Sequence, residues 1–161
     1  MAFNKDQFQY LIERVLWELN MHSVSAVNLL LGTSAQESGF GTYLQQVGGG
    51  PALGVFQMEP DRERDIWLNY LVYRDDLAET VWQVAGAAWD VGPSIPPLET
   101  NLSYQVAMAR IHYLRIKEPL PPHDNVQALA HYWKRHYNTL KGAGSEHEFV
   151  KNYFKYVGDK N

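Results

Sequence analysis

Apolar side chains recur at helical spacing along most of the chain, and this periodicity constrains the fold more than any other feature of the sequence. In residues 8–19 the apolar positions form one stripe of an amphipathic helix. Comparable stripes predict helices over residues 23–39, 60–71, 75–85, 99–117, 124–138 and 145–158. The sequence therefore predicts a mostly α fold.

Short clusters of glycine and proline separate these helices. Residues 48–51 read Gly-Gly-Gly-Pro, which cannot continue a helix. Proline clusters at residues 92–97 and 119–122, and a glycine-containing turn at residues 142–144, separate the later helices. All these breaks are too short to link two domains, so we expect residues 1–161 to form a single domain.

Two helix starts carry recognisable capping residues. Ser23 or Ser25 is suited to cap the second helix, because a serine hydroxyl can accept a hydrogen bond from the first turn. Ser145 and Glu148 have the spacing of a capping box at the start of the last helix.

The composition excludes several classes of protein. A net charge of −4 at pH 7 excludes a nucleic-acid-binding protein that relies on a broad basic surface. The absence of cysteine excludes disulfides, thiolate metal sites and a cysteine nucleophile. The six histidines are scattered without the spacing of a metal site, so we expect neither a metal ion nor an organic cofactor.

The start of the chain carries charges where a signal peptide would need an apolar run. No later stretch approaches the roughly 18 apolar residues of a membrane-spanning helix. We therefore expect a soluble protein with no export signal and no membrane insertion.

Aromatic residues are abundant. Five tryptophans and ten tyrosines in a small protein favour core packing, a ring-lined groove, or both. Trp67 lies in an apolar stripe and is expected in the core. Trp89 precedes a proline-containing break and is expected at the edge of a groove.

The densest group of unusual residues lies between positions 34 and 60. Glu37 ends a predicted helix and is followed by small residues and by the rings of Phe40 and Tyr43. Such surroundings would partly desolvate the carboxyl group, which raises its pKa and keeps it protonated near neutrality. A protonated carboxyl is what a general acid needs to protonate a glycosidic oxygen. The alternative is a solvated glutamate at a helix end.

The same stretch resembles a known family. The run QESGF at residues 36–40, followed by ALGVFQ at residues 52–57, is similar to the signature of soluble lytic transglycosylases and goose-type lysozymes. Residues 136–138 (HYN) resemble the family's Ala-Tyr-Asn element, and residues 149–153 (FVKNY) resemble its closing helix. The four elements occur in the family's order. The resemblance implies a lysozyme-like single domain with helices around a substrate groove.

The resemblance also implies roles for individual residues. Glu37 would be the single catalytic acid, with Ser38 orienting the neighbouring site. Tyr137 would hold the Glu37 carboxyl or a sugar hydroxyl, supported by Asn138. The implied saccharide-binding segment comprises Gly54, Val55, Phe56 and Gln57.

Other positions match the family less closely. Tyr153 would be a second phenol near the acid, and Tyr156 fits that position almost as well. Val55 and Phe56 stand where the family has Leu-Met, and His136 stands where it has alanine.

An acid at Glu37 allows two outcomes. A lytic transglycosylase reuses the same glutamate as a base, so that the 6-hydroxyl of muramic acid closes a 1,6-anhydro ring. A hydrolase must position water, usually with a second carboxylate. Goose-type lysozymes carry an acid two residues after the glutamine of their Gly-Leu-Met-Gln segment, and Glu59 stands there. Because Glu59 also precedes a proline-started helix, where the dipole favours an acid, a structural role stays open.

The resemblance thus implies a glycosidase that cleaves the β-1,4 linkage between N-acetylmuramic acid and N-acetylglucosamine in peptidoglycan. Its partner would be the glycan strand, and we expect a monomer. A substrate in the cell wall, combined with the expected lack of a signal peptide on the protein, favours a bacteriophage protein. It would be either an endolysin held in the host cytoplasm until lysis or an enzyme packaged in the virion. The alternative is a catalytically idle glycan-binding or structural virion protein of the same fold.

Overall fold

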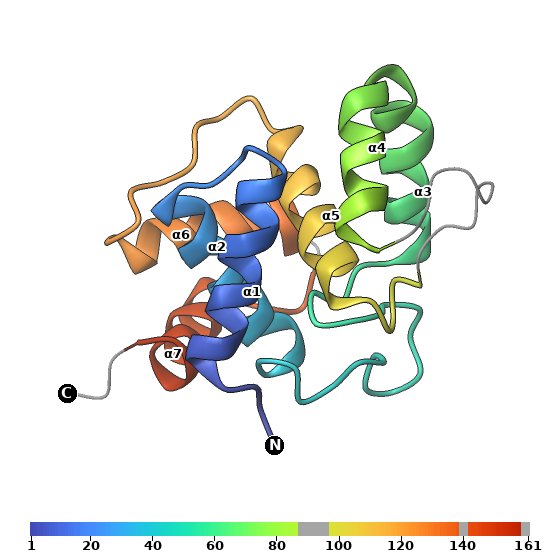
Figure 1. Cartoon of the computed structure of the whole chain (residues 1–161). Helices are drawn as coiled ribbons and strands as arrows, with labels where there is room; N and C mark the ends of the chain where they lie inside the picture. The colour runs from blue at the N-terminus through green and yellow to red at the C-terminus, as the bar shows by residue number, and fades with distance from the viewer. Residues whose placement is uncertain (87–96, 139–141, 159–161) are drawn as a thin grey trace.

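A computed structural model of the protein describes residues 1–86, 97–138 and 142–158, and these ranges form helices and loops without a β-strand. Residues Leu71–Tyr73 (η1) form a 3₁₀ turn, and residues Lys134–Asn138 (η3) form a π-helical turn. The helices in chain order are α1 (Lys5–Glu18), α2 (Val24–Ser38), α3 (Pro60–Asn69), η1 (Leu71–Tyr73), α4 (Asp75–Val84), α5 (Leu102–Leu114), α6 (Val126–Trp133), η3 (Lys134–Asn138) and α7 (Glu146–Tyr156) (Figure 1). The prediction of a mostly α fold is confirmed.

The predicted capping residues begin their helices. Ser23, rather than Ser25, caps α2, because its side chain accepts a hydrogen bond from the backbone of the first turn. Ser145 and Glu148 form the complete capping box at the start of α7.

Two helices differ in extent from the prediction. The helix expected over residues 99–117 is shorter at both ends: the side chain of Asn101 caps the first turn of α5, which begins at Leu102 and ends at Leu114. The helix expected over residues 124–138 is regular only as far as Trp133, after which η3 continues it. A π turn holds more residues than an α turn, so it changes which side chains after Trp133 face inward.

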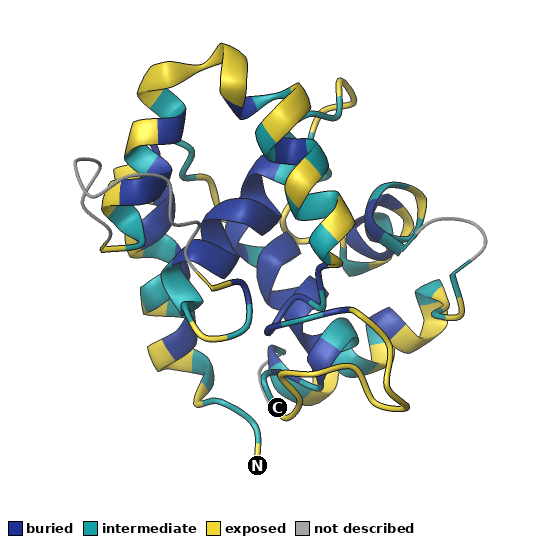
Figure 2. Ribbon diagram, turned by 90° about the vertical axis from the view of Figure 1, so that its right-hand side faces the viewer, coloured by how far each residue is buried: buried dark blue, intermediate teal, exposed yellow. Residues whose placement is uncertain are grey.

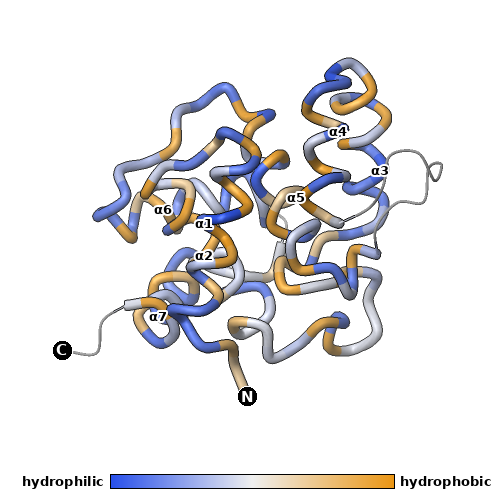
Figure 3. Tube along the Cα trace, viewed as in Figure 1, coloured by the Kyte–Doolittle hydropathy of each residue, from blue (hydrophilic) through white to orange (hydrophobic). Residues whose placement is uncertain are grey.

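α2 is the central helix of the fold. Ten of its fifteen residues are buried, and α1, α5, α6 and α7 all pack against it. Figure 2 shows the buried residues gathered in the middle of the molecule, and Figure 3 shows apolar residues in α2 where it passes through the interior. Gly32 allows α7 to approach, because a Cβ at this position would stand 2.3 Å from the ring of Phe149.

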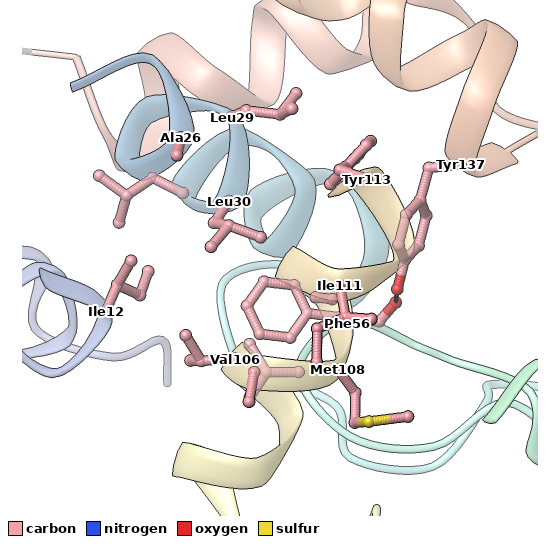
Figure 4. Close-up of a cluster of buried hydrophobic side chains, with 14 of the residues drawn as sticks. Ile12, Ala26, Leu29, Leu30, Phe56, Val106, Met108, Ile111, Tyr113 and Tyr137 are labelled. Atoms are coloured by element: carbon pink, nitrogen blue, oxygen red, sulfur yellow. Dashed lines mark hydrogen bonds between the residues drawn. The ribbon is translucent and has the colours of Figure 1, made fainter. Parts of the chain in front are cut away.

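The core joins segments that lie far apart in the chain. Figure 4 shows Ile12 of α1, Leu30 of α2 and Val106 of α5 around the ring of Phe56, which comes from the loop before α3. Tyr137 of η3 reaches the same loop. The core therefore holds the loop before α3 in place between α1, α2 and α5.

The α3–α4 hairpin stands at one side of the molecule and packs against α5 (Figure 1). Trp67 lies partly buried there, and its indole Nε1 donates a hydrogen bond to the Tyr104 hydroxyl at 2.9 Å. Trp89 lies outside the described residues, so its predicted place at a groove edge has no structural counterpart here. Within the described ranges, every helix is too short or too polar to cross a lipid bilayer.

Candidate active site

Glu37 lies in the last turn of α2. The helix ends there because Gly39 adopts the left-handed conformation, at φ 58°. Ser38 secures the turn: its hydroxyl donates to the Ser34 carbonyl at 3.1 Å and accepts from the Gly41 amide at 2.8 Å. The carboxyl of Glu37 therefore stands at the negative end of the helix dipole, where the ionised form is disfavoured.

The carboxyl of Glu37 is oriented by Trp133. The indole Nε1 of Trp133 donates a hydrogen bond to Oε1 of Glu37 at 2.8 Å. The indole itself is fully buried and packs on Phe149, with 5.3 Å between the ring centroids. Gly144 closes over the ring edge, because a Cβ there would stand 2.7 Å from the indole. A ring packed in this way has little freedom to turn, so it fixes the carboxyl orientation.

Burial raises the pKa of Glu37 to about 7. The hydrogen bond from Trp133 and the positive charges of Arg62 and Lys134 act in the opposite direction, because they favour the carboxylate. Burial is the larger effect, so a substantial fraction of Glu37 carries its proton at neutral pH. Such a carboxyl can give a proton to a bound group and take one back.

Glu37 lines an open cavity of about 360 Å³, here called the Glu37 cavity. Its walls come from the end of α2, from residues 46–62, from Tyr137 and Asn138, and from residues 142–144. Four other predicted site residues also line it: Gln57, Glu59, Tyr137 and Asn138. The volume lies within the range of small-ligand sites, and polar groups dominate the lining, which suits a hydroxyl-rich ligand.

Lys134 holds one wall of the cavity together. Its Nζ donates to Oδ1 of Asn138 at 2.7 Å, to the Gly142 carbonyl at 2.8 Å and to the Gly144 carbonyl at 2.6 Å. These three bonds use all the donors of the ammonium group. Lys134 therefore fastens the turn at residues 142–144 to η3 and keeps Asn138 at the cavity.

The backbone of residues 53–58 forms the opposite wall of the cavity. Leu53 and Met58 exchange two backbone hydrogen bonds of 3.0 Å. Gly54 has φ 75°, and a Cβ there would stand 2.6 Å from the Gln105 side chain, so only glycine fits. The amide Nε2 of Gln57 donates to the Gly54 carbonyl at 2.8 Å. Its Oε1 makes no hydrogen bond within the described residues and is available to a ligand.

Val55 and Phe56, which were expected to line the groove, lie in the core instead. Val55 is fully buried, and its amide donates to Oε1 of Gln105 at 2.8 Å. Phe56 packs near Phe8, with 6.3 Å between the ring centroids. Apolar side chains at these positions gain more from leaving water than from facing a polar cavity. They anchor the loop, and Gln57 presents its side chain to the cavity.

The hydroxyl of Tyr137 forms its hydrogen bond with the loop before α3 rather than with Glu37. Its hydroxyl donates to the Phe56 carbonyl at 2.8 Å (Figure 4). Burial and the nearby Glu37 raise the pKa of Tyr137, so the phenol keeps its proton. Its ring packs edge-on against His112, with 5.0 Å between centroids. Tyr137 thus joins η3 to the loop before α3 and forms part of the cavity floor.

Besides Gly54, Val55 and Phe56, three further residues that the family resemblance placed at the site do not line the Glu37 cavity. The hydroxyl of Ser38 is used by the backbone at the end of α2. Tyr153 lies over Gly32 in the contact between α2 and α7. Tyr156 stacks on Phe40, with 5.9 Å between the ring centroids.

Two further residues lie beside Glu37 or line its cavity, and the sequence patterns did not indicate them. Arg62 lines the cavity, although nothing in the family signature marked it. A signal existed, because Arg62 lies in the first turn of α3, where the helix dipole disfavours a cation. The family signature gave Trp133 no role, whereas its indole donates a hydrogen bond to Glu37. Helical spacing does not relate Trp133 to Tyr137, because the chain leaves α-helical geometry directly after Trp133.

Two of the histidines pair with separate carboxylates. Nδ1 of His131 lies 2.9 Å from Glu146, and Nε2 of His136 lies 3.0 Å from Glu118. In the part of the chain that the structure describes, no group of three or more His, Cys, Asp or Glu residues could hold a metal ion.

Comparisons of the chain with protein-family models, with curated proteins and with solved structures find no match. A function must therefore be inferred from the residues of the Glu37 cavity and from their chemistry.

Trp133→Phe is expected to raise the pKa of Glu37 further, because the lost N–H bond favours the carboxylate over the carboxylic acid. The titration can be followed by carbon NMR of the side-chain carboxyl, assigned with Glu37→Gln. Trp17→Phe is the control, since Trp17 is 66% exposed on α1 and should leave Glu37 unchanged. An unchanged pKa in Trp133→Phe would show that the indole does not act on Glu37.

Proposed function

We propose that the protein is a lysozyme-like glycosidase that cleaves the β-1,4 linkage between N-acetylmuramic acid and N-acetylglucosamine in peptidoglycan, with Glu37 as the general acid. One observation carries the proposal: a carboxyl with a pKa of about 7 is fixed by an indole N–H at the wall of an open, polar cavity. The resemblance of residues 36–40 and 52–57 to soluble lytic transglycosylases and goose-type lysozymes supports the choice of substrate.

In the first step, protonated Glu37 gives its proton to the glycosidic oxygen. The bond between that oxygen and C1 of muramic acid breaks, and positive charge develops on C1 and on the ring oxygen. Glu37 is left as a carboxylate, which stabilises this charge. The indole N–H of Trp133 and the charge of Arg62 make proton release easier, because both favour the ionised form.

The second step decides between hydrolase and transglycosylase. In hydrolysis, a water oxygen bonds to C1 and its proton passes to a carboxylate. Glu59 is exposed at the cavity and is suited to accept that proton. In the transglycosylase reaction, the 6-hydroxyl oxygen of muramic acid bonds to C1 and its proton returns to Glu37. Only the first route requires Glu59.

Product analysis tests this proposal. Mass spectrometry of digested peptidoglycan should show strands cut after muramic acid, ending either in a reducing sugar or in a 1,6-anhydro ring. If the reaction is hydrolysis, Glu59→Gln should reduce the reducing-end product by about 10²-fold or more while binding changes little. Glu79→Gln, on the exposed face of α4, is the matched control.

Two results would contradict these roles. Anhydro products alone, unaffected by Glu59→Gln, would contradict water positioning by Glu59. Intact glycan strands after digestion would contradict the glycosidase proposal itself.

A further inference from the structure

Arg62 lies at the wall of the Glu37 cavity and forms no salt bridge within the part of the chain that the structure describes. It stands in the first turn of α3, where the helix dipole opposes a positive charge. Within the described residues, its guanidinium makes neither a salt bridge nor a hydrogen bond. Four other arginines of the chain pair with carboxylates: Arg14, Arg64, Arg115 and Arg135. A cation kept unpaired in an unfavourable place needs another source of stabilisation.

The contact that Arg62 does make is with the ring of Tyr137. The guanidinium Cζ lies over that ring, 5.0 Å from its centroid. The ring is held by its hydrogen bond to the Phe56 carbonyl and by His112 beside it. Burial, and then the charge of Arg62, lower the pKa of His112 to about 4, so this support is uncharged at neutral pH. Arg62 therefore rests on a rigid and neutral platform.

This arrangement leaves hydrogen-bond donors available in the cavity. A guanidinium carries five N–H donors, and contact with a ring face uses none of them. Lys134, the other cation near Glu37, has all three of its donors occupied by Asn138 and the turn at residues 142–144. Of these two cations, Arg62 is the one whose donors can bind a ligand.

We propose that Arg62 forms a carboxylate-binding subsite of the Glu37 cavity and makes the site selective for anionic glycans over neutral ones. The planar fork of a guanidinium matches a carboxylate with two parallel hydrogen bonds. The identity of the ligand rests on the proposed function. In peptidoglycan the carboxylate is either the free lactyl group of a strand without peptide stems or a carboxylate of the stem itself.

Binding measurements test the subsite without requiring turnover. In the Glu37→Gln background, calorimetry would compare three ligands of equal glycan length: strands stripped of stems, strands that carry stems, and neutral chitooligosaccharides. Arg62→Gln should weaken binding of at least one carboxylate-bearing ligand about tenfold or more, while chitooligosaccharide binding changes less than about twofold. Arg62→Lys should recover part of the loss, because it keeps the charge but not the fork.

Arg64→Gln is the matched control, since Arg64 lies on the same helix and pairs with Asp61 at the surface. It should change none of the three affinities. A loss confined to the stem-bearing strands assigns the carboxylate to the stem, and a loss with the stripped strands assigns it to the lactyl group. Equal loss on all three ligands, no loss on any, or no binding at all would overturn the subsite.

The outcomes also separate the subsite from the proposed function. If the Glu37→Gln protein binds carboxylate-bearing glycans through Arg62 but the wild type cleaves none of them, the glycosidase proposal fails and the subsite stands. If the wild type cleaves peptidoglycan and Arg62→Gln shows no ligand selectivity, the subsite fails alone.

Discussion

Glu37→Gln is expected to slow the clearing of peptidoglycan suspensions by about 10³-fold. Glutamine keeps the shape of the side chain and can still accept the hydrogen bond that Trp133 gives to Oε1. It cannot donate an acidic proton to the glycosidic oxygen, so the loss is chemical rather than structural. The measurement is the fall in turbidity of purified cell walls at equal protein concentration.

The pH dependence of the wild type provides an independent check on the same residue. Because the acid must be protonated, clearing should decline as the pH rises through the Glu37 pKa of about 7. Glu79→Gln should keep the wild-type rate and pH profile, since Glu79 is exposed on α4. Equal clearing by wild type and Glu37→Gln would mean that Glu37 is not the acid.

The second large effect concerns stability, and it does not depend on any function. The Glu37→Gln variant should have a larger free energy of unfolding than the wild type at pH 8. At pH 4 the difference between the two proteins should be smaller. Burial raises the folded-state pKa of Glu37 from 4.5 to about 7, so between these values the folded protein holds a proton that the unfolded chain has released. Wild-type stability is therefore highest below pH 4.5 and declines until the folded carboxyl also ionises near pH 7.

The size of this effect follows from the pKa difference. A full shift corresponds to about 3 kcal/mol, and solvent access through the open cavity reduces it. Urea unfolding of both proteins at the two pH values would measure it. Glu79→Gln should change stability by less than about 0.5 kcal/mol at either pH. A pH-independent difference between Glu37→Gln and wild type would show that the carboxyl is not desolvated.

These two predictions describe one compromise. The burial that keeps Glu37 protonated, as the proposed acid catalysis requires, also lowers the free energy of unfolding at neutral pH. A site residue that costs stability is expected where chemistry needs a perturbed carboxyl.

Local features of the sequence determined much of the secondary structure and part of the site. Helical periodicity located the helices, Ser23 and Ser145 began two of them, and Glu37 was placed at a helix end. Spacing and capping act between neighbours in the chain, so they can be recognised without knowing the fold.

The tertiary structure alone decided what surrounds Glu37. The indole of Trp133 reaches the carboxyl across 96 residues, and Tyr137 reaches Phe56 across 81. The π turn after α6 carries Tyr137 into the core, and no local sequence pattern predicted this turn. Such contacts depend on how whole helix faces pack together. The sequence therefore showed where an acid could stand, and only the packing of α2 against α6 decided that its proton would be retained near neutral pH.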